Sequence, residues 1–141
     1  MNFNENGVLN PGIYEMTWKD FHTFFLFSPR RKELLEGLKK VIDILQDVGC
    51  TIIYIDGSFV TEKIEPGDWD ACVECPPSKI QDLYNKYPLF DKKEQKRLYK
   101  GELFDALSIA DRNENNYISF FQQIRGKNIK KGIIKIKLDK Q

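Results

Sequence analysis

Residues 54–71 read "YIDGSFVTEKIEPGDWDA", and this stretch decides how the fold is interpreted. The β-branched apolar run "TIIYI" (51–55) leads into it, which predicts a strand buried on both faces. The segment "DWDACVEC" (68–75) reads as a second strand and is ended by two prolines. The sequence therefore predicts two strands joined by a connection that begins at Gly57-Ser58.

The two aspartates of the Asp68-Trp69-Asp70 triplet have the spacing of side chains that share one face of a strand. They would lie roughly 6–7 Å apart along the strand, where they can share a hard cation or hold two ions. Trp69 would point the other way, into the core. Gly57 would let a phosphate approach the main chain, and Ser58 offers a hydroxyl at the start of a helical turn.

The remaining elements follow from periodicity and turn residues. Ser28 and Pro29 cap a helix that Gly49 ends, and residues 1–28 are expected to be an extended lead-in packed on the domain. The expected elements after the second strand are a helix (80–87), a charged loop or hairpin tip (91–100), a strand (102–109), a helix (116–124) and an edge strand (132–138). These predict one α/β (α+β) domain over 1–141, with a small mixed β-sheet flanked by helices.

The Gly-Ser pair and the Asp-x-Asp strand together resemble the nucleotidyltransferase superfamily typified by DNA polymerase β. The spacer between the two motifs has nine residues here, within the range of that pattern. Longer phrases, such as "SPRRKELLEGL" and "FFQQIRGKNIKKGI", look like a minimal single-domain bacterial nucleotidyltransferase-like family. The resemblance implies a nucleotidyltransferase fold and a third acidic residue on a later strand. Asp105 matches that position best, and Glu102 is the weaker candidate.

The resemblance also implies a mechanism. Gly57 and Ser58 would hold the β- and γ-phosphates of a nucleoside triphosphate, with ATP as the default. Asp68 and Asp70 would bind Mg²⁺, and Asp105 would complete a site for a second ion and help to deprotonate an acceptor hydroxyl. The acceptor would attack the α-phosphorus, and pyrophosphate would leave.

Bulk properties narrow the class of protein. A net charge of +1 means that nucleic-acid contact would need a local patch. No apolar run approaches the ~18 residues that span a bilayer, and there is no signal pattern, so a cytoplasmic protein without membrane contact is expected. Three cysteines argue against a secreted disulfide framework.

Several side chains allow two interpretations. The Cys72-Val-Glu-Cys75 stretch matches a zinc or redox motif, but side chains three apart on a strand face opposite sides, which favours buried, inert thiols. Glu74 shares a face with the aspartates and is a further candidate for the site. The basic tail of residues 125–140 is either a solvated edge or a patch for RNA or triphosphate, with Lys131 as its phosphate-binding candidate. Arg30 and Arg31 lie at a helix start, where cations are disfavoured, so a ligand or partner role stays open.

Two functions stay open. The first is a Mg²⁺-dependent nucleotidyltransferase that moves a nucleoside monophosphate onto a hydroxyl of a protein, an RNA or a small molecule, within a toxin–antitoxin-like pair or an oligomer. The alternative is a catalytically inactive nucleotidyltransferase-fold protein that acts as a nucleotide- or protein-binding module.

Overall fold

A computed structural model of the chain describes residues 2–86, 89–124 and 126–138. Within them, five strands form one mixed sheet with the spatial order β1-β5-β2-β3-β4. The strands are β1 (Gly12–Glu15), β2 (Ile52–Asp56), β3 (Trp69–Glu74), β4 (Gly101–Asp105) and β5 (Gly132–Lys137). The helices are α1 (Trp18–Phe25), α2 (Pro29–Val48), α3 (Pro77–Lys86), α4 (Lys92–Tyr99) and α5 (Tyr117–Phe121), and η1 (Ser58–Val60) is a single 3₁₀ turn. The prediction of a mixed α/β fold is confirmed.

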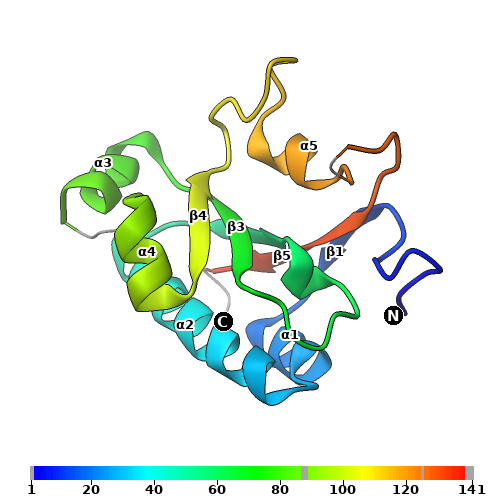
Figure 1. Cartoon of the computed structure of the whole chain (residues 1–141). Helices are drawn as coiled ribbons and strands as arrows, with labels where there is room; N and C mark the ends of the chain where they lie inside the picture. Colours follow the sequence, from blue (N-terminus) through cyan, green and yellow to red (C-terminus); the bar gives the residue numbers. More distant parts are fainter. Residues whose placement is uncertain (1, 87–88, 125, 139–141) are drawn as a thin grey trace.

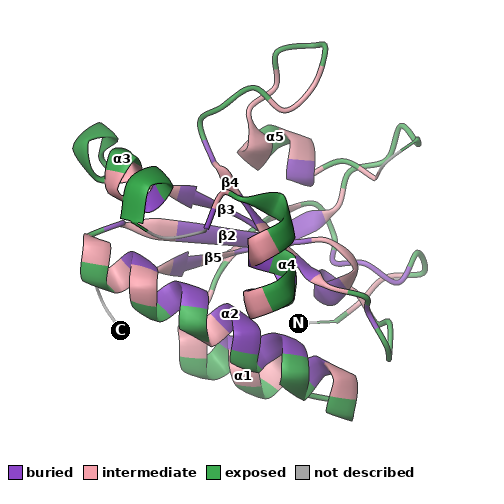
Figure 2. Cartoon of the chain, turned by 60° about the vertical axis from the view of Figure 1, so that its left-hand side comes forward, coloured by how far each residue is buried: buried purple, intermediate pink, exposed green. Residues whose placement is uncertain are grey.

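The sheet is covered unequally on its two faces. Helices α1 and α2 lie along one face, whereas the short α5 lies over the other (Figure 1). Side chains that face α1 and α2 form the main core, and those that face α5 form a second, smaller apolar cluster. The purple, buried stripe of α2 turns toward the sheet while its green residues face solvent (Figure 2). The thinly covered face of the sheet is therefore the one on which a site can open.

Helix α2 begins and ends where the sequence predicts. The Ser28 hydroxyl accepts a hydrogen bond from the Arg31 amide at 3.2 Å, and Pro29 occupies the first turn. Gly49 ends the helix in the left-handed conformation, with φ of 100°. The apolar stripe between them is buried against the sheet, which confirms the helical spacing.

Strand β5 is not at a sheet edge, so that prediction is wrong. It lies between β1, to which it is parallel, and β2, to which it is antiparallel. Its alternation of isoleucine and lysine reflects the unequal cover of the sheet: Ile134 and Ile136 enter the main core, and Lys135 and Lys137 remain half-buried on the other face. A strand with one partly wet face is thus compatible with the middle of this sheet.

The N-terminal 28 residues contain regular structure, which corrects the expectation of an extended lead-in. They contribute β1 as an edge strand and α1 as a helix that starts at the Thr17 cap. Phe21 and Phe25 of α1 are fully buried in the main core. The segment is therefore part of the domain's sheet and core.

The charged segment 91–100 is helix α4, not a loop or hairpin tip. The Asp91 carboxylate caps it by accepting a hydrogen bond from the Glu94 amide at 3.1 Å. The Gln95 side chain is buried and hydrogen-bonds both the amide and the carbonyl of Leu103, on the outer strand β4. The helix thus satisfies part of a sheet edge that would otherwise be open.

The helices on either side of that segment also differ in their limits. Helix α3 confirms the expected helix near 80–87, although Tyr87 lies outside the described residues. Helix α5 confirms the expected helix near 116–124, but it is shorter, ending at Phe121. The Asn116 side chain caps it by accepting a hydrogen bond from the Ser119 amide at 3.0 Å.

The expectation of buried, inert thiols is confirmed for Cys72 and wrong for Cys75. Cys50 and Cys75 form a disulfide that ties the end of α2 to the end of β3, while Cys72 is a buried free thiol on the opposite face of that strand. The opposed faces of Cys72 and Cys75 follow from strand geometry, as predicted. No helix within the described part of the chain is long and apolar enough to cross a membrane.

Candidate metal and nucleotide site

The site begins where β2 ends. Gly57 follows the last residue of β2 with a φ of 83°, a conformation that side chains with a Cβ rarely adopt, and η1 starts at Ser58. The chain then runs through an irregular connection to β3, which returns antiparallel beside β2 with Asp56 opposite Asp70. The Gly-Ser turn and the aspartates are thereby adjacent in space, as the sequence predicts.

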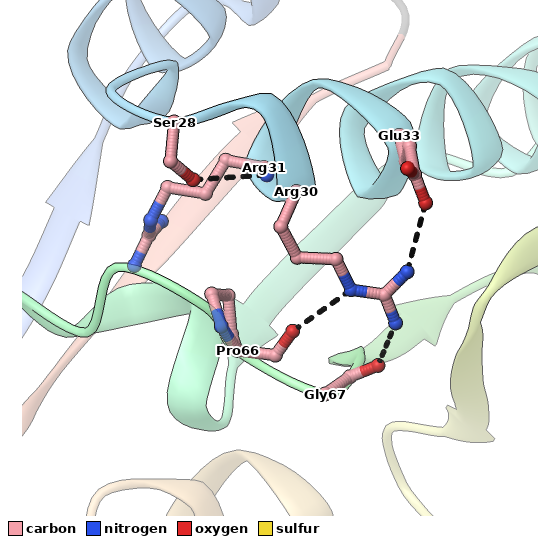
Figure 3. A network of polar contacts seen from close by, with 6 residues as sticks. All are labelled: Ser28, Arg30, Arg31, Glu33, Pro66 and Gly67. Atoms are coloured by element: carbon pink, nitrogen blue, oxygen red, sulfur yellow. Dashed lines mark hydrogen bonds and ion pairs between the residues drawn. The ribbon is translucent and has the colours of Figure 1, made fainter.

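Two arginines at the start of α2 hold this connection (Figure 3). Arg30 donates to the carbonyls of Pro66 at 3.2 Å and Gly67 at 2.6 Å, and pairs with Glu33 at 2.9 Å. The fully buried Arg31 donates to four carbonyls, with bonds of 2.7 Å to both Phe59 and Thr61, and burial lowers its pKa to about 10. Both arginines therefore serve as structural clamps of the segment that precedes Asp68.

A row of carboxylates crosses three neighbouring strands. Asp56 of β2 is opposite Asp70 of β3, and Asp70 is opposite Glu102 of β4. Asp68 immediately precedes β3, and one oxygen each from Asp68, Asp70 and Glu102 lie within 4.8 Å of one another. Three hard oxygen donors this close have the chemistry that Mg²⁺ or Mn²⁺ requires, so these residues fit a divalent cation.

The third carboxylate beside Asp68 and Asp70 is that of Glu102, not that of Asp105 as the sequence favoured. Strands β3 and β4 are parallel, and their register sets Glu102 beside Asp70 but Asp105 beside Val73. Three positions along a strand place Asp105 about 10 Å away and on the other face of the sheet. Its carboxylate instead accepts a hydrogen bond from the Leu107 amide at 3.2 Å, in the turn after β4.

Two lysines neutralise part of this negative charge. Lys96 of α4 lies 2.9 Å from Glu102 Oε1 and 3.6 Å from Asp68 Oδ2, and it is half-exposed. Lys131, the residue before β5, pairs with Asp56 Oδ1 at 3.0 Å in a nearly buried contact. The structure thus places Lys131 beside the carboxylate row, and phosphate binding by Lys131 stays a prediction.

Burial and the crowding of like charges raise the pKa of Asp70, the central aspartate. Burial, followed by the charges of Asp68, Glu102 and Asp56, raises the pKa of Asp70 to about 7, against a smaller opposing effect of Lys96. Burial also raises the pKa of Asp56, although Lys131 and the Gly57 amide oppose this shift. A cation shared by these groups would relieve the repulsion.

A cavity of about 740 Å³ opens from the carboxylate row toward α5. Asp56, Gly57, Asp70 and Glu102 form its floor on the sheet, and aromatic rings of β4 and α5 form a wall. Lysines also line it, from the α4 start and from the segment before β5; these are Lys92, Lys127 and Lys131. This volume is in the range of small-molecule sites in proteins.

The other predicted residues are placed as follows. Trp69 is fully buried in the main core and donates from its indole nitrogen to the Tyr99 carbonyl at 2.8 Å, so its inward direction is confirmed. Glu74 accepts a hydrogen bond from the Tyr54 hydroxyl at 3.2 Å, at the end of β3 away from Asp68. Of the basic tail, Arg125 and Lys140 lie outside the described residues.

Comparison with known proteins gives a family for the chain. Residues 1–137 match the model of a family described as "Family of unknown function (DUF6932)". The chain belongs to this family. No curated protein and no solved structure gives a significant match. Membership of DUF6932 therefore covers the whole sheet and every residue of the carboxylate row, and the function has to be argued from the site.

Two contributors to this DUF6932 site, Asp56 and Lys96, were not predicted from the sequence, and Glu102 was predicted only as the weaker alternative to Asp105. Asp56 has a sequence signal, because a carboxylate that ends a strand of buried residues needs a partner. The place of Lys96 depends on a helix that the charge run 91–100 did not predict, and the choice of Glu102 over Asp105 depends on the β3–β4 register.

Proposed function

We propose that the protein is a Mg²⁺-dependent nucleotidyltransferase that transfers a nucleoside monophosphate from a nucleoside triphosphate to a hydroxyl group. The observation that carries this proposal is the convergence of Asp68, Asp70 and Glu102 beside the Gly57-Ser58 turn. Gly57, Asp70 and Glu102 also line the cavity. The proposal includes a nucleotidyltransferase fold and two sites for Mg²⁺, with Glu102 in the role that the sequence gave to Asp105.

The residues divide the work as follows. Mg²⁺ held by the three carboxylates would neutralise phosphate charge and align the reacting groups. Gly57 and Lys131 both line the cavity, where they would lie beside the phosphates, and the ammonium group of Lys131 supplies a positive charge there. The acceptor oxygen forms a bond to the α-phosphorus as the bond to pyrophosphate breaks, and Glu102 takes the hydroxyl proton.

The test is thermal unfolding with Mg²⁺ and each of the four nucleoside triphosphates. We expect a rise in Tm that needs both components and is lost in Asp70→Asn. The substitution Asp105→Asn is the matched control and should keep the rise. An unchanged Tm with all four triphosphates would contradict the proposal. If Tm rises, incubation of the protein with labelled triphosphates in native cell extract will identify the acceptor.

One observation favours the alternative of a non-catalytic module. Lys96 already bridges Asp68 and Glu102, so part of the carboxylate charge is balanced without a metal ion. On this alternative, the protein binds a nucleotide or a protein partner and makes no pyrophosphate. Release of pyrophosphate during incubation with the labelled extract separates the two functions.

A further inference from the structure

The cavity wall formed by β4 and α5 is rich in aromatic rings. Phe104, Tyr117, Phe120 and Phe121 all line it. Phe104 and Tyr117 are stacked with centroids 4.4 Å apart and an angle of 11° between the rings, and Phe120 meets Tyr117 edge-on at 6.1 Å. Three of the four rings are only half-buried, so the packing of the small cluster does not use up their surface.

Charged side chains line other parts of the cavity. The same cavity has three carboxylates on its floor and lysines at its sides. Lys131 is paired with Asp56, but Lys92 and Lys127 have no carboxylate within ion-pair distance among the residues that the structure describes. Lys127 is also exposed, on the segment between α5 and β5. Its ammonium group is therefore available to an anion.

The ligand that matches this cavity must combine two chemical groups. A flat ring would cover the aromatic wall, because stacking on aromatic side chains is favourable and tolerates any base. A chain of phosphates would meet the lysines directly and the carboxylates through a divalent cation. The volume of about 740 Å³ can hold both groups at once.

We propose that the wall of Phe104, Tyr117 and Phe120 is the base-stacking subsite of a nucleotide whose phosphates extend over the carboxylate row, with Lys127 as a phosphate-contacting side chain. This inference rests on the proposed function and deepens it. It assigns base binding to side chains of β4 and α5, and phosphate contact to Lys127 on the segment that follows α5.

The experiment is isothermal titration of the full chain with non-hydrolysable α,β-methylene analogues of the four triphosphates, each with Mg²⁺. Inorganic tripolyphosphate with Mg²⁺ is the probe that lacks a base. The test variants are Phe120→Leu and Tyr117→Leu, which retain apolar volume and remove a ring. Tyr84→Leu is the control, because Tyr84 stacks on Phe90 with ring centroids 4.5 Å apart and does not line this cavity.

We expect Phe120→Leu and Tyr117→Leu each to weaken all four analogues by about tenfold and to leave tripolyphosphate affinity unchanged. Tyr84→Leu should change neither. Lys127→Ala should weaken the binding of the analogues and of tripolyphosphate alike. Lys130→Ala, on the same segment, should change neither affinity.

The outcomes separate this inference from the proposed function. Equal losses for analogues and tripolyphosphate in the ring variants would mean that the rings only support the fold of the cavity, and would overturn the inference. Tight binding of the analogues with no effect of either ring variant would overturn it too, while the proposed function would stand. Failure of every analogue to bind the unaltered protein would overturn both.

Discussion

The carboxylate of Asp70 occupies the space where a side chain at position 57 would lie. A Cβ built on Gly57 would come within 2.4 Å of Asp70 Oδ2 and 3.1 Å of Asp70 Cγ. The absence of a side chain at Gly57 therefore matters in two ways. It leaves room for the Asp70 carboxylate, and it permits the backbone φ of 83°. The Gly57 turn and the Asp70 carboxylate are therefore packed directly against one another.

We predict that Gly57→Ala lowers the free energy of unfolding by about 1–3 kcal/mol and abolishes the Mg²⁺-dependent rise in Tm. The added methyl group must displace Asp70 or the turn. Two glycine controls separate the causes. Gly49→Ala, at the end of α2, has backbone strain, with φ of 100°, but no close contact, since the nearest atom is Lys79 Cε at 3.7 Å; Gly67→Ala has open space and no such strain. Both controls should keep the response to Mg²⁺, and its loss in Gly49→Ala would contradict the role of the Asp70 contact.

The raised pKa of Asp70 predicts how stability of the metal-free protein depends on pH. The pKa of the Asp70 carboxyl group is about 7 in the folded chain, against an ordinary value of 3.8. Between these two pH values the group is therefore mostly neutral in the folded chain and mostly ionised in the unfolded chain. Its ionisation therefore destabilises the folded state, and stability declines as the pH rises from about 4 to about 7 and levels off above that.

Asp70→Asn should consequently be more stable than the unaltered protein at pH 8 in EDTA, by an amount on the order of a few kcal/mol. The advantage should shrink as the pH falls to 5, and urea unfolding at several pH values measures it. Glu36→Gln, at an exposed position on α2, is the control for removing one negative charge. An advantage of Asp70→Asn that stays constant with pH would refute this account.

The buried pair of Lys131 and Asp56 predicts a different asymmetry. Lys131→Met would leave Asp56 buried without its 3.0 Å partner, so we expect a loss of about 3–5 kcal/mol in the free energy of unfolding. Asp56→Asn combined with Lys131→Met should recover much of the loss, because no uncompensated charge remains. Lys130→Met, at the exposed neighbouring position, should have little effect. Additive losses in the double variant would show that the two side chains do not depend on one another.

The sequence predicts those parts of the fold that depend on local patterns. The Ser28 and Gly49 limits of α2, the buried strand before Gly57 and the inward Trp69 follow from caps, β-branched runs and alternation. The order of strands depends on contacts between distant segments, and so the central place of β5 could not be read from its alternation. The same is true of the Cys50–Cys75 disulfide, whose partners are 25 residues apart.

The candidate site shows the same division. Gly57, Asp68 and Asp70 were predictable because one strand and one turn place them. The third carboxylate depends on the register between two strands that are joined through α3 and α4. A shift of three residues in that register would exchange Glu102 for Asp105 and turn the side chains of β4 to the opposite faces. Apolar residues occur at both alternating sets of positions in "GELFDALSI", so no local pattern decides between the two registers.

That register gives the sharpest prediction about the metal site. Glu102→Gln should lose most of its affinity for Mn²⁺, because one of three oxygen ligands then carries no charge, while Asp105→Asn should bind Mn²⁺ as the unaltered protein does. The two substitutions remove the same charge from the same strand, so any general electrostatic effect is shared. Water-proton relaxation of Mn²⁺ measures the affinity without a nucleotide or turnover. Equal affinities in the two variants would leave Glu102 outside the metal site, and a selective loss in Asp105→Asn would restore the ligand that the sequence favoured.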